Sequence, residues 1–182
     1  MATVLRRDVQ LRFPLGDVNK WASRYAYPRS DAQLDGPLRH AVRKQRYFTR
    51  DQLIEVCRWK SPRAAPKSER NDSAFVEAVT GAAIATANEQ FRIEALTVLN
   101  GVSWPIASVL LHFGVSDDYP ILDFRALWSL SIEVEPHEYR FALWEEYVQT
   151  CRSLAAQAGV SVRIFDKALW QYSKERQPDD EG

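Results

Sequence analysis

The stretch VLNGVSWPIASVLLHF, from Val98 to Phe113, decides how the fold is interpreted. It is the most apolar region of the chain, yet Asn-Gly-Val-Ser interrupts it and the apolar pattern then resumes. Gly101 has no Cβ, so it tolerates the positive φ that a tight turn requires. Pro105 suits the first turn of a following helix, where the missing N–H has no intrahelical partner. The stretch therefore predicts two helices joined by a short glycine-containing hairpin.

Such a hairpin offers more than helix packing. The first N–H groups of its second helix lack intrahelical acceptors and carry partial positive charge. They hold a phosphate without any side chain, which is a way to grip a DNA backbone regardless of its sequence. Packing alone and phosphate binding are the two interpretations. In the second one the contact residues are Asn100, Gly101, Val102, Ser103 and Trp104.

The rest of the chain indicates an all-α fold. Apolar residues recur at helical spacing, glycine is scarce, and no segment shows sustained strand-like alternation. Thr49 precedes a helical pattern and is a predicted N-cap, and either Asp72 or Ser73 is the predicted N-cap of the next one. Gly114 and Gly159 follow such patterns and are predicted helix ends.

The domain organisation follows from the same helical pattern. We expect one compact helical domain over residues 1–175, followed by a disordered tail over residues 176–182. The stretch KSPRAAPKSERND, residues 60–72, has two prolines and several charges, which is typical of a loop. A division into lobes 1–62 and 70–175 at this loop therefore stays open.

Charge is spread unevenly along a chain whose net charge is zero. Residues 1–70 hold 16 Lys and Arg against 7 Asp and Glu, and the remainder is correspondingly acidic. This asymmetry indicates either a polyanion-binding face or two halves that attract each other. Within the basic half, RWKSPR interleaves charge with an aromatic ring, as nucleic-acid surfaces do. Its candidate DNA-binding residues are Arg58, Trp59, Lys60 and Arg63, although burial of Trp59 in the core is the alternative.

Several function classes are disfavoured. No segment approaches the roughly 20 apolar residues of a membrane span, and the first residues lack the apolar centre of a secretory signal. Cys57 and Cys151 are far apart and match no metal-ligand spacing. We therefore expect a cytoplasmic protein with reduced thiols, no membrane partner and no metal site built from side chains.

Beyond these patterns, LNGVSWPIASVLLHFGVSDDYPILDFRALWSL, residues 99–130, resembles the helix-hairpin-helix DNA glycosylase superfamily, known as HhH-GPD. Leu99, Gly101, Val102 and Ala107 match the hairpin of that family. The sequence YPILD matches the approach to its catalytic aspartate, which maps onto Asp123. The resemblance implies a helical fold, usually of two lobes around a cleft, that binds duplex DNA.

The chain departs from the family pattern at three places. Ser103 stands where the second hairpin glycine usually lies, and Trp104 and Pro105 occupy the region of the Schiff-base lysine of bifunctional members. Phe124 and Arg125 replace the usual Thr-His after the aspartate. A lyase mechanism through the hairpin is therefore excluded. The four-cysteine cluster is missing, so no iron–sulfur cluster is expected, whereas a monovalent cation at the hairpin is compatible with the resemblance.

The resemblance implies a monofunctional glycosylase in which Asp123 stabilises positive charge on the sugar of an extruded nucleotide. Arg125 is a further DNA-binding candidate beside it. The simpler interpretation makes Asp123 only the N-cap of the next helix. An inactive DNA-binding protein and a helical protein-interaction module are the alternatives to an enzyme. Aromatic residues available to stack on a base are Trp59, Trp104, Tyr119 and Trp128.

Overall fold

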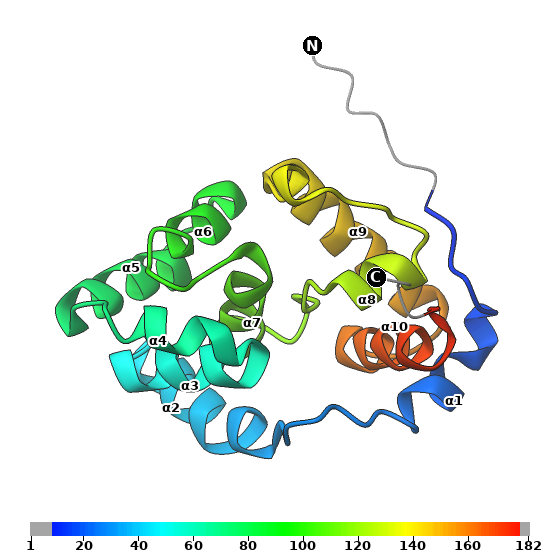
Figure 1. Cartoon of the computed structure of the whole chain (residues 1–182), viewed down its shortest axis with the longest axis horizontal. Coiled ribbons are helices and arrows are strands. Elements are labelled where there is room, and N and C mark those ends of the chain that lie inside the picture. The colour runs from blue at the N-terminus through cyan, green and yellow to red at the C-terminus, as the bar shows by residue number, and fades with distance from the viewer. Residues whose placement is uncertain (1–8, 179–182) are drawn as a thin grey trace, which may run out of the picture. The chain divides into compact units, whose positions relative to one another are not determined.

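The computed structural model describes residues 9–178, which form helices and connecting turns and contain no strand (Figure 1). The predicted all-α fold is therefore confirmed. None of the helices in this range combines the length and apolar character of a membrane span. The helix α10 continues to Arg176, where the tail was expected to begin, and residues 179–182 of that tail lie outside the described range.

The chain forms two compact units. The middle unit is Tyr27–Ile121, and the end unit combines Met1–Ala26 with Leu122–Gly182. This grouping differs from the lobes 1–62 and 70–175, because residues 60–72 are an integral part of the middle unit. They hold the turn η3 (Pro62–Ala64) and the helix α4 (Ala65–Ser68), both with proline in the first turn, where the ring is tolerated.

The middle unit contains the other elements between Tyr27 and Ile121. They are η2 (Leu34–Leu38, a π-helix), α2 (Arg39–Gln45), α3 (Arg50–Lys60), α5 (Ser73–Ala85), α6 (Glu89–Leu96) and α7 (Trp104–Gly114). Helix α7 lies against α2, α3 and α6. Its residues from Ile106 to Gly114 are all buried, so α7 is the central helix of this unit.

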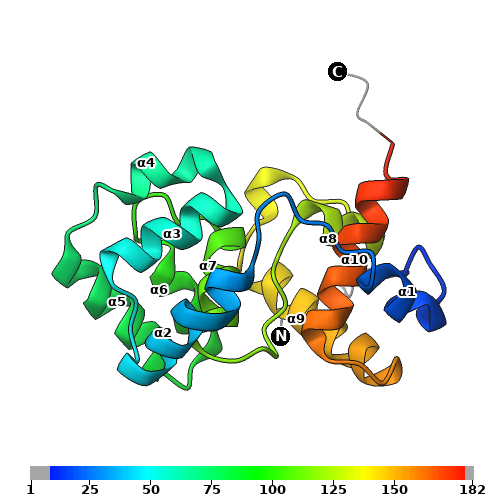
Figure 2. The same cartoon turned by 90° about the horizontal axis from the view of Figure 1, so that it is seen from below.

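The end unit is built from both ends of the chain. Its elements are η1 (Leu15–Asp17), α1 (Val18–Ala22), α8 (Phe124–Ser129), η4 (Pro136–Glu138), α9 (Phe141–Gln157) and α10 (Val162–Arg176). Helix α10 contacts α1, α8 and α9 (Figure 2). The hydroxyl of Ser129 donates to the carbonyl of Leu169 at 2.6 Å, which fixes α8 on α10.

The helix ends follow the predicted chemistry. Thr49 accepts from the N–H of Gln52, whose side chain in turn accepts from the N–H of Thr49, as in a capping box. Asp72 caps α5 by accepting from the N–H of Phe75. Helix α9 ends just before Gly159, which has a φ of +65°.

The turn between α6 and α7 depends on Gly101. Its φ is +83°, in the left-handed region that glycine tolerates best. A Cβ at this position would lie 2.8 Å from both the carbonyl oxygen of Ala64 and the backbone nitrogen of Ser68. The turn therefore lies directly against the backbone of residues 64–68, and both the conformation and the space exclude a side chain.

Asn71 fixes the same turn from its other end. Its side-chain oxygen accepts from the N–H of Asn100 at 2.8 Å, and its side-chain nitrogen donates to the carbonyl of Asn100 at 2.9 Å. The same nitrogen also donates to the carbonyl of Ser68 at 2.8 Å. Because Asn71 is buried, these hydrogen bonds are shielded from competing water, and they tie the α6–α7 turn to α4.

We expect Gly101→Ala to lower the free energy of unfolding by about 2 kcal/mol or more, because it adds left-handed strain to a backbone clash. Urea denaturation measures the change. Gly36→Ala is the matched control, since a Cβ there meets nothing within 4 Å and Gly36 lacks a positive φ. Equal stability of the two variants would contradict the tight seating of the turn.

Candidate nucleic-acid interface

The α6–α7 turn, where the sequence predicts the hairpin, leaves part of its backbone open. The N–H of Asn100 donates to Asn71, and the N–H of Val102 donates to the carbonyl of Leu99 at 3.1 Å. By contrast, the N–H groups of Ser103 and Trp104 donate to no acceptor in the described part of the chain. The N–H of Gly101 likewise has no acceptor among the described residues, so the open amides of the expected set 100–104 are those of Gly101, Ser103 and Trp104.

Helix α7 differs from most longer helices in its cap. Side chains cap α3, α5, α6, α8 and α10, whereas the side chain of Ser103 makes no capping hydrogen bond. Ser103 is exposed and Trp104 is half-buried. Ser103 has a φ of −92°, so this position does not require the glycine that the family pattern places there. The start of α7 is accessible to an anion from solvent.

Exposed basic side chains lie beside the hairpin on residues 62–71, here called the basic segment. They are Arg63, Lys67 and Arg70. The Cβ of Lys67 would lie 3.3 Å from a Cβ built on Gly101, so the segment and the turn are in direct contact. Positive side chains and open helix N–H groups therefore share one part of the middle unit. Both suit phosphate oxygens.

The RWKSPR stretch separates into exposed and buried residues. Arg58 and Arg63 are exposed, and Arg58 lies 3.9 Å from Glu69 in a weak surface ion pair. Trp59 is buried, with its ring against Tyr27 at a centroid distance of 4.7 Å. Trp59 is therefore a core residue and no stacking platform, which is the alternative that the sequence left open.

Lys60 is half-buried at the end of α3. The sequence did not single out Lys67, Arg70 or Asn71, because they lay in the predicted loop. The sequence did contain a signal for two of them, because Lys67 and Arg70 are further cations within seven residues of Arg63. Only the contact with Gly101 shows which of these residues adjoin the hairpin.

Asp123 is the N-cap of α8 in the end unit. Its Oδ1 accepts from the N–H of Arg125 at 2.9 Å, and its carbonyl accepts from the N–H of Leu127 at 2.9 Å. The predicted capping role is therefore present. The residue is half-buried, so its carboxylate is not sealed in the core. Capping and a chemical role remain compatible.

The charge of this carboxylate acts on two tyrosines of the end unit. Burial and the negative charge of Asp123 raise the pKa of Tyr139, which is half-buried. Burial also raises the pKa of Tyr147, with further contributions from Cys151, Asp166 and Asp123. Both phenols therefore stay protonated near neutral pH. The charge of Asp123 therefore acts on two neutral phenols of the same unit.

Tyr119 and Trp128, two more of the predicted stacking residues, contact other residues of the chain. The hydroxyl of Tyr119 donates to Glu89 at 2.8 Å, and the residue is buried. The ring of Trp128 lies below the guanidinium of Arg12 at 4.4 Å and stacks on Tyr172. His112, on the central helix, is buried with Nδ1 2.9 Å from the carbonyl oxygen of Tyr119, as expected of a core histidine.

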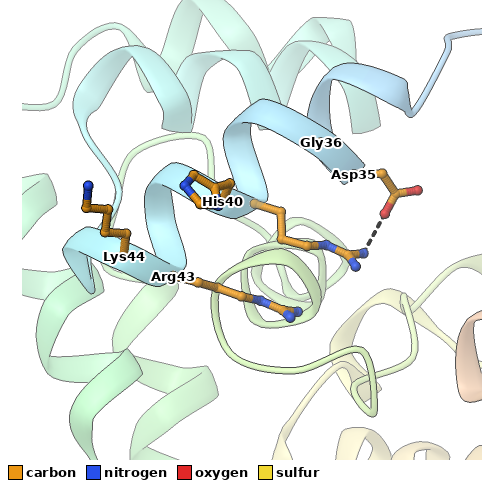
Figure 3. Close-up of a pocket in the computed structure, with 6 residues that line it drawn as sticks. Asp35, Gly36, His40, Arg43 and Lys44 are labelled. Carbon is orange, nitrogen blue, oxygen red and sulfur yellow. Dashed lines mark hydrogen bonds and ion pairs between the residues drawn. The ribbon is translucent and has the colours of Figure 1, made fainter.

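A concave region with a volume of about 440 Å³ lies on α2 and the π-helix η2 (Figure 3). Here Asp117 accepts from Arg39 at 2.9 Å and from Arg43 at 2.5 Å. Burial opposes the charge of Asp117, but the hydrogen bond from Arg43 and the positive charges of both arginines outweigh it and lower its pKa. Arg43 also donates to the carbonyls of His112 and Phe113. These arginines therefore tie α2 to the end of α7.

An apolar groove of about 370 Å³ lies between α5 and α6, which run beside each other in Figures 1 and 2. Alanine and valine side chains line it together with Phe91, which is 50% exposed, and Val98, which is 60% exposed. An exposed apolar surface of this kind is typical of protein contacts. It is the feature of the middle unit that favours the protein-interaction alternative.

Over residues 9–178, no group of three or more His, Cys, Asp or Glu side chains is arranged to hold a metal ion. The monovalent cation at the hairpin would need backbone carbonyls, and it stays a prediction. Comparison of the chain with family models, with curated protein sequences and with solved structures finds no match. The resemblance to the HhH-GPD glycosylases therefore rests on the residues of the chain itself.

Proposed function

We propose that this protein binds duplex DNA through the middle unit. In this proposal the open N–H groups of Ser103 and Trp104 hold one phosphate, and the basic segment contacts neighbouring phosphates. The observation that carries it is the left-handed Gly101 seated on residues 64–68, because this contact brings the turn that leads into the uncapped start of α7 beside Lys67. Contacts of this kind recognise the DNA backbone and carry no base specificity.

Electrostatics supports DNA over a neutral partner. Each phosphate that a cation neutralises releases counterions, so affinity depends steeply on salt. Arg63, Lys67 and Arg70 are exposed, which leaves their charges accessible to a polyanion. The apolar groove between α5 and α6 is the basis of the second candidate, a helical protein-interaction module. That candidate predicts no salt-dependent binding of duplex DNA.

We expect the double variant Arg63→Ala, Lys67→Ala to bind a labelled duplex roughly tenfold more weakly near physiological salt. The slope of log affinity against log salt should become shallower by about two, because two phosphate contacts are lost. Fluorescence anisotropy at several salt concentrations measures both quantities.

Lys44→Ala is the control for this binding experiment, since Lys44 is exposed on α2 of the same unit. It should bind with the wild-type slope. Wild-type protein that binds no duplex even at low salt would contradict the proposal. So would a double variant that keeps the wild-type slope.

We further propose that Asp123 serves base excision as in a monofunctional glycosylase. The glycosidic bond would break with its electron pair leaving on the base, and the carboxylate would stabilise the positive charge on the sugar. Water would then add its hydroxyl to the sugar carbon, and its proton would balance the departing base. The partial exposure of Asp123 and the neutral phenols near it favour this role.

We expect Asp123→Asn to lower the rate of base release by at least about 100-fold, because asparagine preserves the cap but removes the charge. Release from duplexes bearing modified bases is measured by strand cleavage at the resulting abasic sites. Asp72→Asn is the matched control, since Asp72 is also a capping aspartate. Equal release by wild type and Asp123→Asn would remove the catalytic role, and no release by wild type would leave DNA binding alone.

A further inference from the structure

The residue that follows Asp123 is an exposed aromatic. Phe124 is 59% exposed at the start of α8, and it is the most exposed large apolar side chain described in the end unit. A single exposed apolar residue is ordinary by itself. Its surroundings here are not ordinary, because the neighbouring side chains are a cation and a second aromatic ring.

Arg125 lies between two rings. Its guanidinium carbon is 5.1 Å from the ring centroid of Phe124 and 5.9 Å from that of Trp170 on α10. Lys174, one turn further along α10, lies 5.2 Å from the Trp170 ring. Aromatic rings and cations therefore alternate from Phe124 at the start of α8 to Lys174 on α10. Trp170 is buried, so Phe124 is the ring of this cluster that is accessible to a ligand.

The cluster has the composition of a nucleobase-stacking surface. A planar base gains from stacking on an aromatic face, and arginine adds a cation–π contribution without reading the base sequence. The cations also favour the adjoining phosphates. The N-cap fixes the position of Arg125 relative to Asp123, since Asp123 accepts from the N–H of Arg125.

We propose that Phe124, supported by Arg125 and Trp170, stacks an unpaired nucleobase beside Asp123. The ligand class is a nucleotide that is out of the duplex stack, within an otherwise paired strand. This inference rests on the proposed function, because the middle unit would supply the backbone contacts. It assigns the recognition of the unpaired base to Phe124 of the end unit, because none of the four aromatic residues expected from the sequence, in either unit, has this exposure.

The test compares two duplexes of one sequence, one fully paired and one with a single unpaired thymine. Anisotropy titrations should show that wild type prefers the second duplex by roughly 5- to 150-fold, the range expected for stacking one base. Phe124→Ala should abolish this preference and leave the affinity for the paired duplex unchanged. Phe124→Trp should keep the preference, because it retains an aromatic face.

Phe75→Ala is the matched control, since Phe75 is 47% exposed on α5 of the middle unit. It should keep the wild-type preference. The inference is overturned if wild type shows no preference while it binds the paired duplex, or if Phe124→Ala keeps the preference. Wild type that binds neither duplex overturns the proposed function as well, so the two failures are distinguishable.

Discussion

The close contact between Gly101 and the backbone of residues 64–68 is the constraint on which the middle unit depends. The φ of Gly101 is +83°, which glycine tolerates best. Any other residue would also place a Cβ 2.8 Å from the carbonyl oxygen of Ala64. This contact sets the direction in which the buried helix α7 leaves the turn. Asn71 reinforces it through hydrogen bonds to both backbone groups of Asn100. Packing and the proposed anion site therefore have one structural cause.

The two proposed contacts divide DNA recognition between different kinds of chemistry. Open N–H groups and cations in the middle unit suit phosphates, which are the same at every step of the duplex. The carboxylate of Asp123 and the exposed ring of Phe124 in the end unit suit a sugar and a base that have left the stack. Asp123 contributes to folding through its cap and is only half-buried. A capping role is thus no argument against a chemical one.

The sequence predicted the helical class, the caps at Thr49 and Asp72, and the turn at Gly101, because these follow from local backbone chemistry. It did not predict the division into units, since two prolines that usually mark loops lie in the first turns of short helices. The burial of Trp59 and the exposure of Phe124 depend on tertiary packing, which local patterns do not contain. Likewise, the position of Lys67 beside the turn follows from a long-range contact.

The most direct measurement of the central claim follows backbone amide signals by heteronuclear NMR during titration with a duplex. If the start of α7 holds a phosphate, the amide signals of Ser103 and Trp104 should shift progressively and saturate with binding. The amides of Asn100 and Val102, which already donate within the protein, should respond much less. Duplex binding that leaves Ser103 and Trp104 unshifted would contradict the account.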